Sequence, residues 1–149
     1  MRRLQVHLDE KLGMTVHRRI LKKSKLVYLL TAASPVKYKA GRSKVVYIGT
    51  TKKGVGRIAG SAAWRAEEIM SARGLKEVNV FVVSCSSRPG VPTWERLEDA
   101  LIAEFRAEYE ELPMCNSQGK KKKWDDELDR LFKRRIINKV LKHFDPRGV

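Results

Sequence analysis

The chain has 149 residues, 42% of them apolar, and 32 Lys and Arg against 17 Asp and Glu give it a net charge of +15. This length allows one domain with a modest core. No apolar run approaches the roughly 20 residues of a transmembrane helix. The N-terminus lacks a long apolar block, so we expect no secretory signal and a cytoplasmic location. The positive excess favours a polyanionic partner, with nucleic acid ahead of an acidic membrane.

The basic residues are clustered along the chain. Residues 1–24 form a basic arm, which we separate from a domain over 25–149. The second cluster lies near the C-terminus and contains Lys120, Lys121, Lys122, Lys123, Arg134 and Arg135. We expect this cluster to grip the DNA backbone, a contact that weakens as salt rises. The alternative is a solvated surface that happens to be rich in lysine.

Two short apolar segments predict the first strands. Residues 25–33 (KLVYLLTAA) and 44–49 (KVVYIG) are rich in strand formers. Pro and Gly between them predict a long hairpin connection. The connection is a candidate DNA-contacting loop, or else a flexible solvated loop, and it carries Lys37, Tyr38, Lys39 and Arg42.

A helix is predicted over 57–73, because two glycines precede it and Gly74 provides a C-cap. A third strand is predicted over 78–85 from its β-branched residues. After a loop with two prolines, Thr93 is expected to cap a helix that ends at Leu112.

The chain then continues past the lysine run into a last helix predicted over 124–144. The order of elements predicts an α+β fold, with a small three-stranded antiparallel or mixed sheet flanked by helices and an extra C-terminal helix. Cys85 and Cys115 lack the spacing of metal ligands, and we expect two reduced, packed thiols.

One acid is predicted inside the helix that ends at Leu112. At about 100° per residue, the apolar residues of this helix share one face, and Glu98 lies near the middle of that face. Three other acids fall on the solvent-facing side of the helix, namely Glu95, Asp99 and Glu110. A buried carboxylate must meet a cation, a metal or a hydrogen-bond donor. Glu98 is therefore either a functional residue or half of a structural ion pair.

Two tyrosines and an arginine follow the pattern of a known nuclease family. Residues 26–28 (LVY) resemble the first element of the GIY-YIG endonucleases, of which only Tyr28 is kept. Residues 47–49 (YIG) match the second element letter for letter. Arg57 follows Tyr47 by ten positions, at the start of a predicted helix, where the family places its arginine.

The resemblance continues into the second half of the chain. Glu98 stands in an ExxLI arrangement with Leu101 and Ile102, similar to the family's metal-binding glutamate. Pro113 and Asn116 resemble the closing Pro and Asn of the family. The topology implied by the family, a three-stranded antiparallel sheet flanked by helices, agrees with the elements predicted from the residues.

The chain also departs from the family pattern. The two tyrosines are farther apart than usual, and the first element lacks its Gly-Ile. Ser61 stands where many members carry a histidine one turn after the arginine, which puts a histidine base in doubt. The restriction enzymes of the family are similar to this chain in offering a tyrosine and a nearby lysine instead.

The resemblance implies a Mg²⁺- or Mn²⁺-dependent hydrolase that cuts a phosphodiester bond in DNA. Glu98 would hold a single metal ion, because Mg²⁺ keeps much of its water shell and one carboxylate suffices. Arg57 would bind the scissile phosphate through its planar, permanently charged fork. The alternative for Arg57 is a surface position or a salt bridge to Glu98.

The two tyrosines are the residues expected to act on the nucleophilic water. Tyr47 would orient or deprotonate the water, helped by a cation such as Lys52 or Lys53, and Lys53 is also a candidate DNA contact. Tyr28 would support the water or the phosphate. For either tyrosine the alternative is core packing. Asn116 would hydrogen-bond within the site, or else serve as a turn residue.

Other classes of function stay open. The main rival is a non-catalytic basic protein that binds DNA or RNA on a nuclease-like fold. A structural subunit of a larger complex is a third possibility. If the chain cuts both DNA strands, a homodimer or two sequential nicks would be needed.

Overall fold

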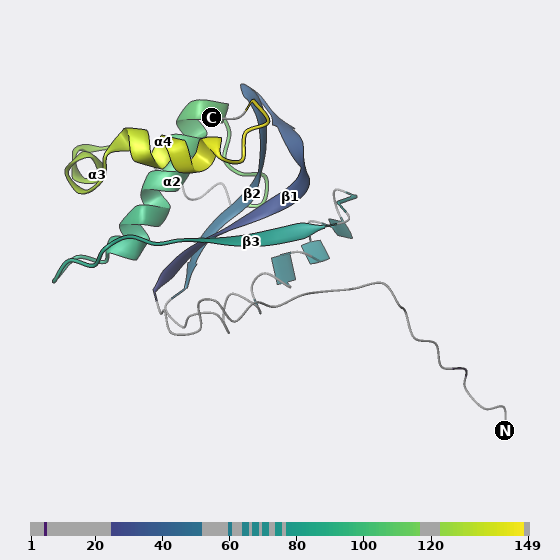
Figure 1. The fold of residues 1–149 in the computed structure, drawn as a ribbon, viewed down its shortest axis with the longest axis horizontal. Helices are drawn as coiled ribbons and strands as arrows, with labels where there is room; N and C mark the ends of the chain where they lie inside the picture. The colour runs from purple at the N-terminus through teal and green to yellow at the C-terminus, as the bar shows by residue number, and fades with distance from the viewer. Residues whose placement is uncertain are drawn as a thin grey trace.

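The computed structural model describes residues 5, 25–51, 60, 64–65, 67–68, 70–71, 74–75, 77–116 and 123–147. They form an α+β fold in which helices pack on one three-stranded antiparallel sheet (Figure 1). This confirms the predicted class and sheet. No helix among these residues is long and apolar enough to cross a membrane. The predicted basic arm lies outside the described residues, except for residue 5.

The first two strands form one long hairpin. Strand β1 spans Leu26–Tyr38, strand β2 spans Gly41–Thr51, and a tight turn joins them. The prediction of a long connecting loop is therefore wrong, because most of that stretch continues the two strands. The cause is the burial of Tyr38. Its hydroxyl donates to the carbonyl of Val45 at 2.7 Å, and its ring packs edge-on against Phe105.

Irregular pairing between β1 and β2 decides which side chains share a face. The register shifts just after Thr31, which accommodates the Ser-Pro pair inside β1. A second shift falls at Val46, since Leu30 pairs with Tyr47 but Thr31 pairs with Val45. As a result the neighbours Val46 and Tyr47 both pack with the cluster that contains Leu30. The bulge thus turns Val46 onto the face where the regular pairing with Leu30 already places Tyr47.

The third strand, β3, spans Val78–Val83 and pairs antiparallel with β1, so that the strand order is β2-β1-β3. The prediction of a strand over 78–85 is confirmed except for its last two residues. Cys85, beyond the end of β3, is exposed, and the expectation of a packed thiol is wrong for it. Cys115 is half-buried, and the two cysteines form no disulfide with each other.

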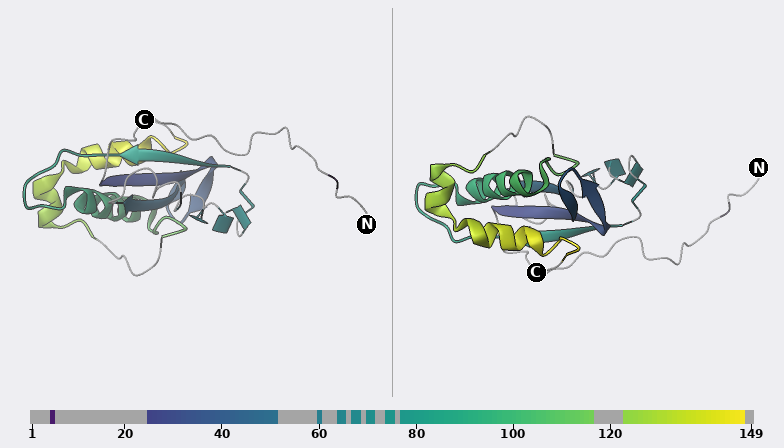
Figure 2. Two further views of the ribbon diagram at one scale, coloured as in Figure 1. Left: turned by 90° about the horizontal axis from the view of Figure 1, so that it is seen from below. Right: turned by 90° about the horizontal axis from the view of Figure 1, so that it is seen from above.

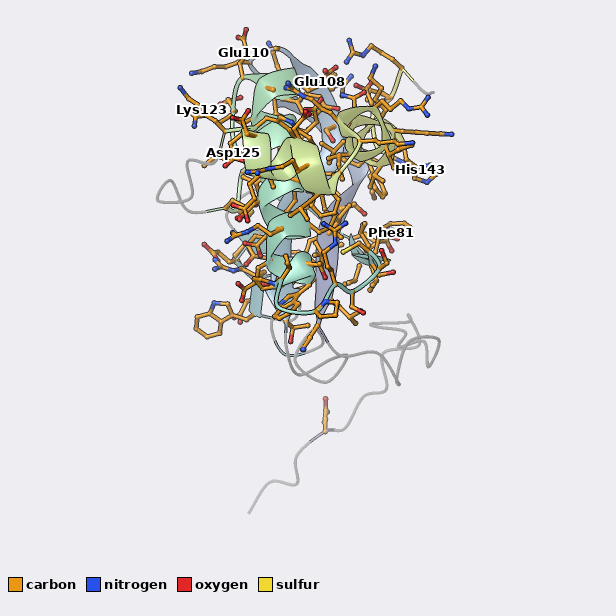
Figure 3. The ribbon with its side chains drawn as sticks, turned by 90° about the vertical axis from the view of Figure 1, so that its left-hand side faces the viewer. Phe81, Glu108, Glu110, Lys123, Asp125 and His143 are labelled. Atoms are coloured by element: carbon orange, nitrogen blue, oxygen red, sulfur yellow. The ribbon has the colours of Figure 1, made fainter. Side chains whose placement is uncertain are left out.

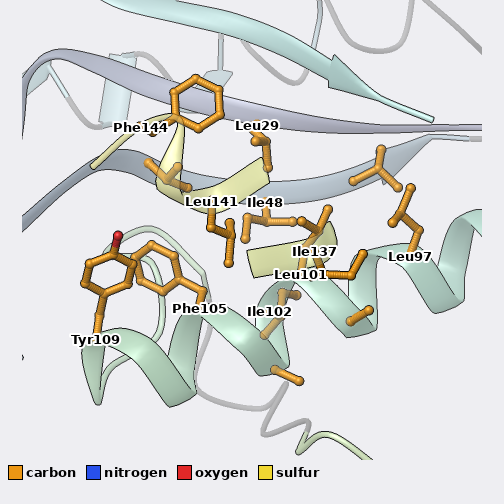
Figure 4. Packing of buried hydrophobic residues seen from close by; sticks show 14 of the residues in the cluster. Leu29, Ile48, Leu97, Leu101, Ile102, Phe105, Tyr109, Ile137, Leu141 and Phe144 are labelled. Atoms are coloured by element: carbon orange, nitrogen blue, oxygen red, sulfur yellow. The ribbon is translucent and has the colours of Figure 1, made fainter. Parts of the chain in front are cut away.

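Helix α2 spans Thr93–Tyr109 and covers one face of the sheet (Figure 4). Its residues Leu101 and Ile102 are buried against Leu29 of β1 and Ile48 of β2. The predicted apolar face of this helix is therefore confirmed.

The ends of α2 differ from the prediction. Thr93 is the first helical residue, and Pro92 occupies the N-cap position without capping side-chain hydrogen bonds. At the other end, Glu110 adopts the left-handed conformation with φ of 56°. This conformation ends the helix before Leu112.

The C-terminal segment, predicted as a single helix, forms two. Helix α3 spans Asp126–Leu131, and helix α4 spans Arg134–Lys142. The break falls at Phe132, whose backbone is extended with φ of −131° and ψ of 142°. The break allows Ile137 and Leu141 of α4 to reach the same core as α2 (Figures 2 and 4).

The opposite face of the sheet carries a smaller buried cluster. Its buried members are Leu26, Tyr28, Leu30, Ala32 and Val46. Leu75 packs partly against this cluster. All described positions between 60 and 71 are helical, in line with the predicted helix, whose start lies outside the described residues. Gly74 has a φ of 64°, as expected for the predicted C-cap.

The end of the chain is tied back to the hairpin and α2. The N–H of Lys44 donates to the carbonyl of Phe144 at 2.9 Å. The Tyr109 hydroxyl donates to the Asp145 carboxylate at 3.1 Å, and Arg147 Nη2 donates to the same oxygen at 2.6 Å. The hydrogen bonds from Arg147 outweigh the effect of burial and lower the pKa of Asp145 to about 2.

Candidate active site

Two tyrosines from paired strands lie together near one end of the sheet. Tyr28 of β1 pairs across the strands with Gly49 of β2, and Tyr47 lies two residues before that glycine. The tyrosine ring centroids are 5.8 Å apart with an interplanar angle of 43°. A Cβ at Gly49 would lie 2.6 Å from Cε1 of Tyr47 and 3.0 Å from Cζ and the hydroxyl oxygen of Tyr28. Only glycine leaves room for both rings.

The two tyrosines differ in exposure. Tyr28 is 3% exposed, whereas Tyr47 is half-buried. A water or a phosphate can therefore approach Tyr47 more easily than Tyr28. This difference agrees with the predicted roles, in which Tyr47 acts on the water and Tyr28 supports it.

A cation that the sequence analysis missed lies over Tyr47. The guanidinium carbon of Arg65 is 5.1 Å from the centroid of the Tyr47 ring, a cation–π geometry. Arg65 Nη1 also donates to Glu68 Oε2 at 3.0 Å. The cations expected beside Tyr47, Lys52 and Lys53, lie outside the described residues.

A signal in the sequence could have pointed to Arg65. It follows Arg57 by eight residues, a spacing that places both on one side of a continuous α-helix. Arg57 itself lies outside the described residues, so its predicted contact with the scissile phosphate stays a prediction.

Glu98 is buried, as the helical periodicity predicts. It is 5% exposed, and its Oε2 atom is fully enclosed. It takes part in an interaction within the structure, and the neighbouring Leu97 packs in the core. Keeping a carboxylate charged at such a position requires compensation by a cation, a metal or hydrogen-bond donors.

Glu98 and the tyrosines belong to different layers at the same end of the sheet. Helix α2 packs on the face that carries Val27, while Tyr28 and Tyr47 belong to the cluster on the opposite face. Leu97, next to Glu98, lines a hollow together with Val27. A site that uses all of these residues would therefore lie at the end of the sheet, where the two layers meet.

The other acids in the middle of α2 have structural partners. Asp99 was predicted on the solvent-facing side, but it is buried, and Arg96 Nη1 donates to its Oδ2 at 2.9 Å. The prediction of a solvent-facing Asp99 is wrong, because its ion pair with Arg96 offsets the cost of burying the carboxylate. Glu104 is also buried, and it accepts hydrogen bonds from Arg134 Nε at 2.6 Å and from Asn138 Nδ2 at 2.9 Å.

Asn116 holds the backbone of β2 next to the tyrosines. Its Oδ1 accepts from the N–H of Ile48 at 3.0 Å, and its Nδ2 donates to the carbonyl of Ile48 at 2.8 Å. The N–H of Cys115 donates to the carbonyl of Val46 at 3.0 Å, so this segment runs beside β2. Asn116 also closes a turn, since its N–H donates to the carbonyl of Pro113 at 2.9 Å. The turn, which was the alternative for Asn116, is therefore present, and the role of Asn116 within a catalytic site stays a prediction.

A metal ion at this site would depend on few protein ligands. The described residues contain no group of three or more His, Cys, Asp or Glu that could hold a metal ion together. Mg²⁺ is often held by one or two carboxylates and keeps several waters. A carboxylate is a donor type that Mg²⁺ accepts, so Glu98 stays a predicted ligand.

The residues predicted to bind nucleic acid fall into three groups. Those that are exposed are Lys37, Lys39, Arg42, Lys123 and Arg135, of which Lys123 is labelled in Figure 3. Arg134 is half-exposed, but it is engaged by Glu104 and lies over the ring of Trp124, with 5.3 Å between guanidinium carbon and centroid. The rest, outside the described residues, are Lys53, Lys120, Lys121 and Lys122.

Comparison with known proteins gives no matching family model, no matching curated protein and no matching solved structure. The assignment of a function therefore depends on the residues and the geometry described above.

Proposed function

We propose that the chain is a metal-dependent DNA endonuclease, restriction-like and built on a GIY-YIG-like fold. The observation that carries this proposal is the tyrosine pair over Gly49. A Cβ at position 49 would come within 2.6 Å of Tyr47 and 3.0 Å of Tyr28. The glycine lets both phenol rings lie against the strand, which fixes their separation. This arrangement fits a site in which the position of both phenol groups matters.

Hydrolysis of a phosphodiester needs an in-line water, neutralisation of the phosphate charge and stabilisation of the leaving oxygen. A divalent metal ion supplies charge neutralisation and activation of water. Glu98 would hold that ion. Tyr47 would orient the attacking water, and the more deeply buried Tyr28 would support the water or the phosphate. Arg57 would bind the scissile phosphate.

The charge of the protein suits a DNA substrate. The net charge of +15 favours a polyanion, and exposed cations are present at the tip of the β1–β2 hairpin and on α4. Such side chains contact phosphates without reading sequence. Cleavage of both strands would need two copies of the chain, or two successive nicks by one copy.

The test is cleavage of supercoiled plasmid by the purified chain at low salt. The assay is run with Mg²⁺ or Mn²⁺, and again with EDTA. We expect nicked or linear plasmid in the presence of either metal, and none in EDTA. The assay is repeated with linear, single-stranded and branched DNA. If the protein shifts DNA on a gel but cuts none of these substrates with either metal, the proposal is contradicted. That result would favour the rival function, a basic protein that binds nucleic acid without catalysis.

A further inference from the structure

We infer that Arg65 is a positioning residue that holds the phenol ring of Tyr47 in the site. This inference rests on the proposed function only for its effect on cleavage, because the contact itself can be tested without activity. Arg65 is not among the residues that carry the resemblance, and it is not the arginine assigned to the scissile phosphate.

The first support is the geometry at Tyr47. The guanidinium carbon of Arg65 is 5.1 Å from the ring centroid on one side. The ring of Tyr28 is 5.8 Å away, and Gly49 leaves the space below both rings open. Arg65 thus comes from the helical segment to meet a ring that β1 and β2 have already oriented.

The second support is that Arg65 is itself held in place. Its Nη1 donates to Glu68 Oε2 at 3.0 Å, one turn further along the helix. Burial opposes its charge, but the hydrogen bond to Glu68 and the nearby Tyr47 raise the pKa of Arg65 above its ordinary value. The guanidinium therefore stays charged. A planar, charged group restrained at one end suits the face of a ring better than a mobile lysine would.

The function of this arrangement follows from the exposure of Tyr47. A half-buried phenol on a strand can rotate away from the reacting water unless something packs on its outer side. A displacement of about 1 Å at a reacting group can lower the rate about a hundredfold. Arg65 acts through Tyr47, so its loss should lower kcat more than it raises KM.

Four variants separate this role from the alternatives. Arg65→Met keeps a good helix former and removes the charge, and Arg65→Lys keeps the charge and removes the planar group. Glu68→Gln weakens the restraint on Arg65. The control is Arg96→Met, because Arg96 also forms an i,i+3 ion pair, at 2.9 Å with the buried Asp99, on a different element from both tyrosines.

The first measurement is ring NMR of the protein labelled with ¹³C at the tyrosine ε positions. The chain has four tyrosines, and Tyr47→Phe assigns the relevant signal. We expect Arg65→Met to shift the Tyr47 signal while the signals of Tyr38 and Tyr109 stay in place, and Arg96→Met to shift none of them. An unchanged Tyr47 signal in Arg65→Met would overturn the inference, whatever the activity of the protein.

The second measurement is the steady-state cleavage of DNA. For Arg65→Met we expect kcat to fall about 10- to 100-fold, with KM changed by less than about threefold. Arg65→Lys should recover part of kcat, and Glu68→Gln should lose less than Arg65→Met. If Arg65→Met raises only KM and also binds DNA more weakly in Ca²⁺, the inference is overturned and Arg65 is a simple DNA contact. If the wild-type chain cuts no DNA, the proposed function fails, and the NMR measurement alone decides the inference.

Discussion

Tyr28 and Tyr47 come from two paired strands, and their ring centroids are 5.8 Å apart beside Gly49. Gly49 lies directly across from Tyr28 in the β1–β2 ladder. The spacing of the two phenols is therefore set by the register of the strands and by the glycine. Tyr47 lies on the same face as Tyr28 because it pairs with Leu30, two residues after Tyr28, in the regular part of the ladder.

Gly49→Ala should disturb both tyrosines. The new methyl group would lie 2.6 Å from Tyr47 Cε1, so one ring or the strand must move. We expect a loss of stability of about 1–3 kcal/mol from overpacking and a fall in cleavage of about a hundredfold. Thermal unfolding and plasmid nicking measure the two effects. Gly60→Ala is the control, because a Cβ there meets no described atom within 4 Å and the position is helical. Equal behaviour of the two variants would show that Gly49 is not needed for space.

Asn116→Ala should loosen β2 next to the site. The substitution removes the amide that binds both the N–H and the carbonyl of the buried Ile48, at 3.0 and 2.8 Å. We expect a loss of about 1–3 kcal/mol in the free energy of unfolding, together with reduced cleavage. The exposed Asn79→Ala serves as the control, and we expect no measurable loss. If Asn116→Ala unfolds like the wild type, the two hydrogen bonds do not hold β2 in solution.

Arg134 and Arg135 are neighbours on α4 with different expected roles. Arg134→Ala should cost about 1–3 kcal/mol of stability, because it removes one of the hydrogen bonds to the buried Glu104. Arg135 is exposed, and Arg135→Ala should leave stability unchanged. Arg135→Ala should instead reduce, by about one, the magnitude of the negative slope of the log binding constant against the log salt concentration. Denaturant unfolding and DNA-binding titrations at several salt concentrations test the pair. The reverse pattern would mean that Arg134 is the DNA contact.

The stability of the protein should fall in acid partly through Asp145. The hydrogen bonds from Arg147 lower the pKa of this carboxyl to about 2 in the folded protein, against an ordinary value of 3.8. A lowered folded pKa stabilises the fold above the unfolded pKa, and this contribution is lost as pH falls from about 4 towards 2. Asp145→Asn should lower stability at pH 7 and flatten the pH dependence between 4 and 2. Chemical unfolding at several pH values measures this slope. A slope equal to that of the wild type would exclude Asp145 as its source.

The parts of the fold that follow from local patterns could be predicted from the sequence. The helical period of α2 predicts that Glu98 is buried, and the β-branched residues of β3 predict a strand. The tyrosine pair follows from two strands of one hairpin. Gly74, predicted as a cap, has the left-handed backbone that such a cap needs.

The remaining features depend on contacts between distant residues. Pro35 indicated a loop, but the burial of Tyr38 continues β1 past it. The break between α3 and α4 occurs at Phe132 without glycine or proline, because packing of α4 on the core decides its direction. Asp99 is buried because Arg96 pairs with it. The contact of Arg65 with Tyr47 joins two elements that no motif connects.

The most direct test of the central claim compares two buried carboxylates on the same helix. Glu98 is 5% exposed and takes part in an interaction within the structure, and Glu104 is 6% exposed and accepts hydrogen bonds from Arg134 and Asn138. We would measure plasmid cleavage, DNA binding and thermal unfolding for Glu98→Gln and Glu104→Gln. The loss of a metal ligand removes several kcal/mol of transition-state stabilisation, so we predict that Glu98→Gln cleaves at least about a hundredfold more slowly while it still folds and binds DNA. Glu104→Gln should lose stability and keep its cleavage activity below its unfolding temperature. If Glu98→Gln cuts as fast as the wild type, Glu98 does not hold a catalytic metal, and the proposed nuclease mechanism is wrong.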